Sequence, residues 1–117
     1  MAGYGNKTVT LREKQSRFVR MIADLIAYAY ENGYEMTFAE AYRPPELAEL
    51  YEKQGRGIKN SLHTQRLAID LNLFKDGNYL TDGSGHNELH DFWDAIGGAK
   101  RIAKDLNHYS ILHNGTR

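Results

Sequence analysis

The sequence predicts an α+β fold, a small antiparallel sheet with flanking helices. Residues 18–29 and 86–96 carry apolar side chains at helical spacing, whereas residues 67–74 alternate with the period of a strand. Asp76-Gly77 is a hairpin signal, which favours antiparallel pairing of the strands on either side. The predicted elements follow in the order helix, strand, helix, strand, strand, helix, strand.

The first half of the chain contains two predicted helices and one strand. Thr10 to Glu13 forms a capping-box pattern, and the helix that it begins ends at Gly33. Residues 34–42 are rich in side chains that suit a strand. Pro44 and Pro45 then open a helix over residues 46–54, because proline suits the first helical turn.

The second half places several polar side chains on strands. In the strand over residues 67–74, Asp70 lies on the face opposite the leucines. A short strand is expected over residues 78–81 and a helix over residues 86–96, which Gly97-Gly98 ends. In the last predicted strand, residues 107–112, His108 and Ser110 share one face.

Composition narrows the class of protein. A chain of 117 residues suits one domain over residues 1–117, and its formal net charge of zero gives no general attraction to nucleic acid or anionic membranes. The absence of cysteine excludes disulfides and thiolate metal ligands. Met1 to Lys7 lacks the apolar run of a signal peptide, so we expect synthesis and folding in a cytoplasm. Basic side chains of the first helix are expected to form its solvated face: Arg12, Lys14, Arg17 and Arg20.

Two segments carry the side chains of a possible zinc site, residues 61–70 and 105–108. His63, Asp70 and His108 offer two imidazoles and one carboxylate, and three protein ligands with one open position are typical of catalytic zinc. Asp105 is a further carboxylate that could deprotonate the attacking water. Each residue alone is more often a turn former or an ordinary surface or core residue. Their joint pattern favours a small zinc hydrolase.

Two other groups could bind a metal. His86 and His90 lie four apart on a predicted helix, but Glu88 falls on its far side, so this is not the H-E-x-x-H arrangement. We expect both histidines to be exposed near the helix start, and a second metal there stays open. Asp76 to Asp82 superficially resembles a calcium loop, yet Leu80 occupies a ligand position, which favours a hairpin turn.

The pattern S-x-H-x-x-x-x-A-x-D followed by D-x-x-H resembles a known zinc peptidase family. That family contains D-alanyl-D-alanine carboxypeptidases, vancomycin-resistance D-Ala-D-Ala dipeptidases and phage L-alanyl-D-glutamate endolysins. Residues 42–51 also resemble the family's arginine-then-helix segment, and the similarity spans roughly Phe38 to Leu112. It implies the fold shared by hedgehog domains and D-Ala-D-Ala peptidases.

The resemblance also implies roles for individual residues. His63, Asp70 and His108 would bind zinc, and Asp105 would be the general base. Arg43 would stabilise the oxyanion or hold a substrate carboxylate, and Ser61 would contact the substrate. The chain departs from the pattern in two places: Arg66 stands where the family commonly has glycine, and Asp105 where many members have glutamate.

The function implied is that of a zinc-dependent peptidoglycan peptidase, a phage-type endolysin that cleaves the L-alanyl-D-glutamate bond. Its partner would be the stem peptide of the bacterial cell wall, reached by a monomer after holin-dependent release from the host cytoplasm. One alternative is a D-Ala-D-Ala carboxypeptidase or dipeptidase. The other is a non-catalytic, zinc-stabilised binding module, as in the hedgehog signalling domain.

Overall fold

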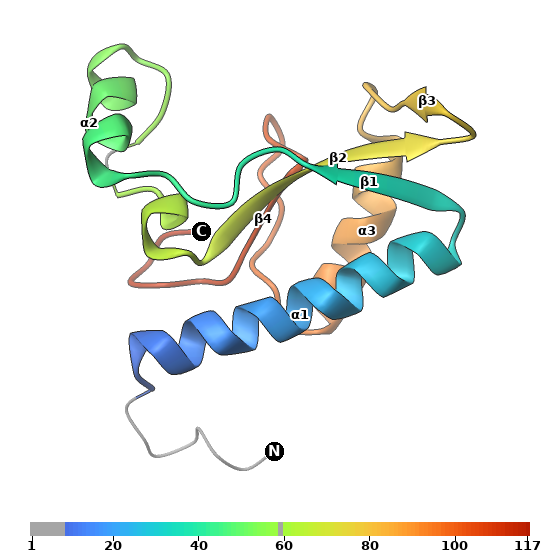
Figure 1. Cartoon of the computed structure of the whole chain (residues 1–117), viewed down its shortest axis with the longest axis horizontal. Helices are drawn as coiled ribbons and strands as arrows, with labels where there is room; N and C mark the ends of the chain where they lie inside the picture. Colours follow the sequence, from blue (N-terminus) through green and yellow to red (C-terminus); the bar gives the residue numbers. More distant parts are fainter. Residues whose placement is uncertain (1–8, 59) are drawn as a thin grey trace.

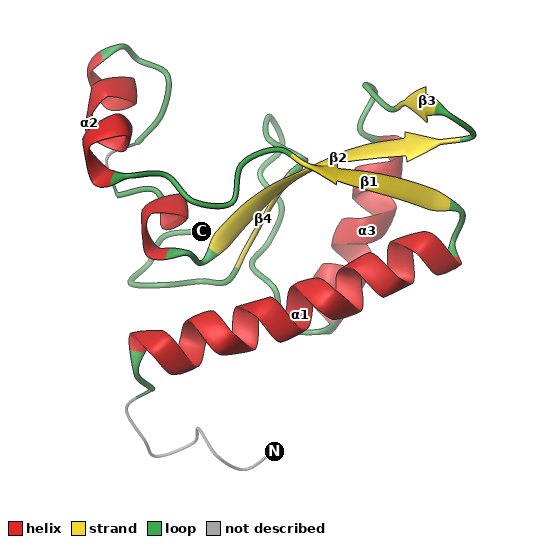
Figure 2. Cartoon of the chain, viewed as in Figure 1, coloured by secondary structure: helices red, strands yellow, loops and turns green. Residues whose placement is uncertain are grey.

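The computed structural model describes residues 9–58 and 60–117 of the chain. Residues 1–7, where no signal-peptide pattern is present, lie outside the described residues. The predicted fold class and the predicted order of helices and strands are confirmed, and a short 3-10 helix, η1, is added (Figures 1 and 2). The elements are α1 (Leu11–Glu31), β1 (Tyr34–Phe38), α2 (Pro45–Lys53), η1 (Leu62–Gln65), β2 (Ala68–Lys75), β3 (Asn78–Tyr79), α3 (Ser84–Ala95) and β4 (His108–Ser110).

Strand β2 is the centre of the sheet, and all its neighbours run antiparallel to it (Figure 2). Its C-terminal half pairs with β1 and β3, whereas its N-terminal half pairs with β4. The predicted turn between β2 and β3 is confirmed, because Asp76 and Gly77 both have positive φ, 52° and 78°, as a two-residue hairpin of type I′ requires. The last strand is shorter than residues 107–112.

One face of the sheet forms the hydrophobic core against α1 and α3. Leu67, Leu71 and Leu73 are fully buried on this face, as the alternation predicted. Trp93 of α3 fills the space beneath them, and its indole Nε1 donates to the Ser110 carbonyl at 2.8 Å. This packing leaves the opposite face of β2, which carries Asp70, turned away from the core.

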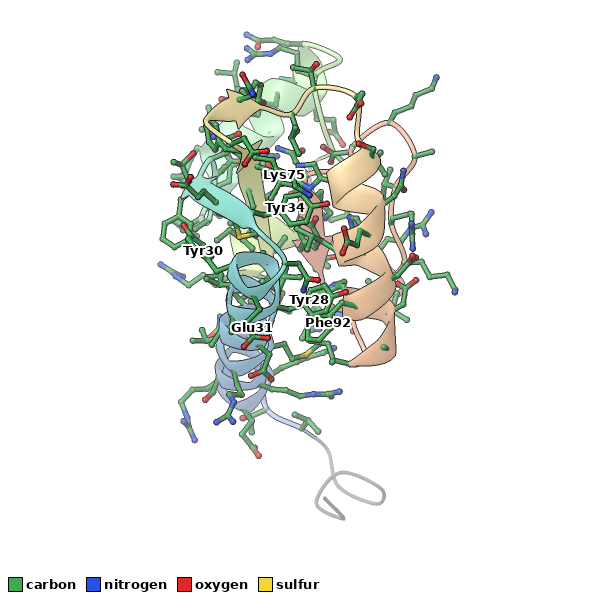
Figure 3. All side chains as sticks on the ribbon, turned by 90° about the vertical axis from the view of Figure 1, so that its right-hand side faces the viewer. Tyr28, Tyr30, Glu31, Tyr34, Lys75 and Phe92 are labelled. Carbon is green, nitrogen blue, oxygen red and sulfur yellow. The ribbon has the colours of Figure 1, made fainter. Side chains whose placement is uncertain are left out.

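Aromatic side chains join the two helices that cover the sheet. Tyr28 of α1 stacks on Phe92 of α3, with ring centroids 4.2 Å apart, and Figure 3 shows the two rings side by side. The capping box at the start of α1 is confirmed, since Thr10 Oγ1 accepts from the Glu13 amide at 3.1 Å. Gly33 follows the helix with φ of +86°, the left-handed conformation expected of it.

The first strand ends four residues earlier than predicted. Phe38 pairs with Leu71, but Ala39 and Glu40 then both oppose Asp70: the Ala39 amide donates to the Asp70 carbonyl, and the Asp70 amide donates to the Glu40 carbonyl. Two residues opposite one is the arrangement of a β-bulge. The extra residue shifts Glu40 from the core side, where strict alternation would place it, to the side of Asp70.

The prediction of exposed histidines at the start of α3 is wrong. His86 and His90 are both buried, because the last strand and the loop before it cover this side of the helix. The helix also begins two residues earlier, at Ser84. In the described part of the chain, no helix combines the length and the apolar character that crossing a membrane requires.

Candidate metal centre

Three elements bring His63, Asp70 and His108 together. Asp70 on β2 and His108 on β4 are directly paired residues, so their side chains lie on the same face of the sheet. His63 comes from η1, just before β2. The Asp70 carboxylate oxygen Oδ1 lies 3.2 Å from His63 Nε2 and 3.2 Å from His108 Nδ1.

The segment before β2 turns sharply, and this turn aims His63 at Asp70. Ser61 Oγ accepts from the His63 amide at 3.3 Å and so caps η1. Arg66 ends η1 in the left-handed conformation, with φ of 56°. A glycine would adopt this conformation without strain, which explains physically why glycine suits the position. Arg66 is held there with its guanidinium 3.9 Å from the centre of the Tyr42 ring.

The donor set fits a zinc ion. Ligands bound at 2.0–2.1 Å in a tetrahedron lie about 3.3 Å from one another, and two of the separations here are 3.2 Å. All three donor atoms lie within 4.8 Å of one another. Burial alone would raise the pKa of Asp70, but hydrogen bonds from His108 and His63 outweigh it and lower the pKa to about 2. The carboxylate therefore stays ionised, as a metal ligand must be.

Asp105 lies beside this group without belonging to it. Its Oδ2 is 3.9 Å from His108 Nδ1, and its side chain is 49% exposed. Burial of the other half raises the pKa of Asp105 above its ordinary value. Among the described residues, no arginine or lysine forms an ion pair with it. The structure thus leaves the Asp105 carboxylate available next to the donor set.

Glu40 is a site residue that the sequence interpretation missed. Its Oε1 lies 3.8 Å from His63 Nε2, and the same carboxylate pairs with Arg43 through the guanidinium Nε and Nη2. This pairing raises the pKa of Arg43 further. The Arg43 amide also donates to the His63 carbonyl at 3.2 Å. The sequence did hint at this pair, because Glu40 and Arg43 are only three residues apart. An unbroken strand over residues 34–42, however, would have placed Glu40 on the core face of the sheet, away from Asp70.

The three donor residues line one cavity of about 390 Å³, together with Arg43 and Asp105 but without Glu40. The predicted site residues all contribute to its wall, and the loop after α2 and the end of the chain add two further arginines. The lining residues are Arg43, Arg56, Gly57, Ile58, Ser61, His63, Asp70, Ile102, Asp105, His108 and Arg117.

The buried histidines of α3 contact the segment that carries Asp105 and His108. His90 Nε2 donates to the Leu106 carbonyl at 2.8 Å, and the His90 ring stacks on Tyr109 with centroids 4.3 Å apart. His86 Nδ1 lies 2.7 Å from the Tyr109 hydroxyl. Both contacts reach the segment that carries Asp105 and His108. Burial lowers the pKa of His86 to about 4 and also lowers that of His90, so burial favours the neutral form of both rings.

Solved structures with this fold include two peptidases. The L-Ala D-Glu endopeptidase ChiX of Serratia marcescens superposes with a TM-score of 0.68 at 17% identity, over 87% of this chain and 83% of that chain. A variant of the vancomycin-resistance D,D-pentapeptidase VanY from a VanB-type cassette, solved with Zn(II), gives a TM-score of 0.60 at 19% identity. That match covers 83% of this chain and 71% of the VanY chain.

A scan against protein-family models and a search of curated proteins found no match to the sequence. The structural likeness nevertheless settles the fold. The chain has the D-Ala-D-Ala peptidase-like fold that the sequence motifs predicted.

Proposed function

We propose that this protein is a zinc-dependent peptidase of the bacterial cell wall, with His63, Asp70 and His108 as its metal ligands. The observation that carries the proposal is the convergence of these three donors in one cavity with a second carboxylate, Asp105, which no arginine or lysine among the described residues neutralises. The fold of an L-Ala D-Glu endopeptidase and of a zinc-containing D,D-pentapeptidase supports the same class of reaction.

Asp105 is the general base and then the general acid. When bound, zinc supplies a Lewis acid that polarises a carbonyl and lowers the pKa of water toward about 7. Asp105 takes the proton of the attacking water and returns it to the leaving amine. Glu40 lies at a similar distance from a proposed ligand, but Arg43 already neutralises it. That difference favours Asp105 over Glu40 as the base.

Arg43 stabilises the negative charge that develops on the scissile carbonyl. Its Nε and Nη2 are hydrogen-bonded to Glu40, and no hydrogen bond among the described residues uses Nη1. An N–H donor held in this way needs little reorganisation when charge develops. Ser61, which lines the same cavity, contacts the bound peptide.

The bond we propose is L-alanyl-D-glutamate, because an endopeptidase of that specificity superposes over most of both chains. In this reading the protein is an endolysin-type enzyme that meets the stem peptide as a monomer. A D-Ala-D-Ala carboxypeptidase is the second candidate, favoured by the likeness to the D,D-pentapeptidase. A non-catalytic zinc-stabilised module is disfavoured, since it would have no use for a half-exposed carboxylate beside the proposed metal ligands.

Digestion of purified peptidoglycan by the zinc-loaded protein tests the proposal. Mass spectrometry of the products is expected to show new N-terminal D-glutamate, whereas released D-alanine would indicate the second candidate. The Asp105→Asn variant should keep about one zinc per chain and lose activity by a factor of about 100 or more, a typical loss for removal of a general base. Full activity in that variant would refute the mechanism, and no cleavage by the parent protein would refute the function.

A further inference from the structure

A second guanidinium stands at the cavity beside the one already described. The ring of Tyr51, on α2, contacts both Arg43 and Arg56, whose guanidinium carbons are 5.1 Å and 4.5 Å from its centre. The Arg56 amide donates to the Tyr51 carbonyl at 2.7 Å, and Arg56 Nη1 donates to Gln54 Oε1 at 3.0 Å. The end of α2 therefore holds Arg56 in a defined place.

The charges of these two arginines are balanced differently. The Glu40 carboxylate neutralises Arg43. No ion pair between described residues involves Arg56, and the same is true of Arg117, which also lines the cavity. The same wall carries two carboxylates, Asp70 and Asp105, but among the described residues neither forms an ion pair with Arg56 or Arg117, so both guanidinium charges remain available at the cavity. Such a site attracts anions.

We propose that Arg56 binds a carboxylate of the substrate, on the leaving side of the scissile amide. This inference rests on the proposed function, and it adds that the site selects peptides with a free carboxylate next to the bond that is cleaved. Guanidinium groups bind carboxylates in a planar, two-bond geometry. Arg56 has donors left for it, because only one of its N–H groups is bonded to a described side chain.

Both candidate substrates carry the required group. A glutamate has two carboxyl groups, so when one of them continues the stem peptide the other remains as a free carboxylate. In a D-Ala-D-Ala peptide, the terminal carboxylate is attached to the carbon that bears the leaving nitrogen. The chemistry that Arg56 recognises is therefore the same for either bond, and the test uses both substrates.

Matched peptide pairs measure this recognition. Each pair contains an L-alanyl-D-glutamate or a D-Ala-D-Ala peptide with its free carboxylate, and the same peptide with that group converted to a carboxamide. The zinc-loaded protein is expected to cleave the acid with a kcat/KM about tenfold above that of the amide, the usual contribution of a charged hydrogen bond. Arg56→Gln should remove most of this preference and Arg56→Lys only part of it. Added salt should weaken it in the parent protein.

Arg20→Gln is the matched control, because Arg20 lies on the exposed face of α1 with its side chain 82% exposed. It should leave the preference unchanged. Equal cleavage of acid and amide by the parent protein, or an unchanged preference in Arg56→Gln, would overturn the role of Arg56. If no peptide is cleaved, the proposed function fails, and calorimetric binding of the same pairs to zinc-loaded Asp105→Asn protein decides the carboxylate role separately. Equal affinity for acid and amide would then refute it.

Discussion

The ion pair between Glu40 and Arg43 should couple the two residues strongly, although neither binds the metal in our proposal. Their side chains are 28% and 13% exposed. Exposed pairs contribute up to about 1 kcal/mol, whereas removing one partner of a fully buried pair costs about 3–5 kcal/mol. A pair between these limits, with two hydrogen bonds, should show a coupling free energy of about 2 kcal/mol.

A double-mutant cycle measures this coupling. The parent protein, Glu40→Gln, Arg43→Gln and the double variant are unfolded in urea with a chelator present, so that metal binding does not contribute to the free energy of unfolding. The control cycle uses Arg20 and Asp24, whose side chains are 82% and 49% exposed, and its coupling should be below about 0.5 kcal/mol.

Equal coupling in the two cycles would refute the reasoning, because it would mean that the bulge does not hold Glu40 against Arg43. A catalytic consequence is expected as well. With zinc bound, Glu40→Gln should lower kcat more than it lowers zinc content, because Arg43 loses the partner that orients it. An unaltered kcat would show that Arg43 needs no such support.

Two further predictions concern the histidines. By elemental analysis, His63→Ala should reduce bound zinc from about one equivalent per chain to near zero. The control variant His113→Ala, which removes the partner of Lys14, should keep its zinc. Zinc retained by His63→Ala would reject the ligand assignment. Burial lowers the pKa of His86 to about 4 from 6.5, so the unfolded chain binds a proton that the folded chain does not. The free energy of unfolding is therefore expected to be highest above pH 6.5 and to fall by up to about 3 kcal/mol as the pH drops toward 4. In the His86→Gln variant this part of the pH dependence should be absent. The free energy of unfolding in urea, measured for both proteins between about pH 4 and pH 7, tests this, and the same pH dependence in both would contradict the prediction.

Local patterns accounted for most elements of the fold. The capping box at Thr10, the left-handed Gly33 and the Asp76-Gly77 hairpin are formed by residues close together in the chain. Alternation along β2 likewise predicted that Asp70 faces away from the leucines. These features were predictable because neighbouring residues decide capping, turn type and strand faces.

Contacts between distant segments decided what the sequence patterns could not. The bulge opposite Asp70 depends on how β1 meets β2, and it brings Glu40 to the side of the proposed metal ligands. His86 and His90 have the spacing of an exposed helical pair, yet β4 and the loop before it bury them.

By itself, then, the sequence determined the types of side chain in the candidate site and the faces of the strands that carry them. Tertiary structure decided which charges meet there. The approach of Glu40 to His63, and the meeting of Arg43, Arg56 and Arg117 in the wall of one cavity, both follow from the packing of separate segments. The physical reason is that side-chain period is a local property of the backbone, whereas charge pairing depends on distances that only the folded chain defines.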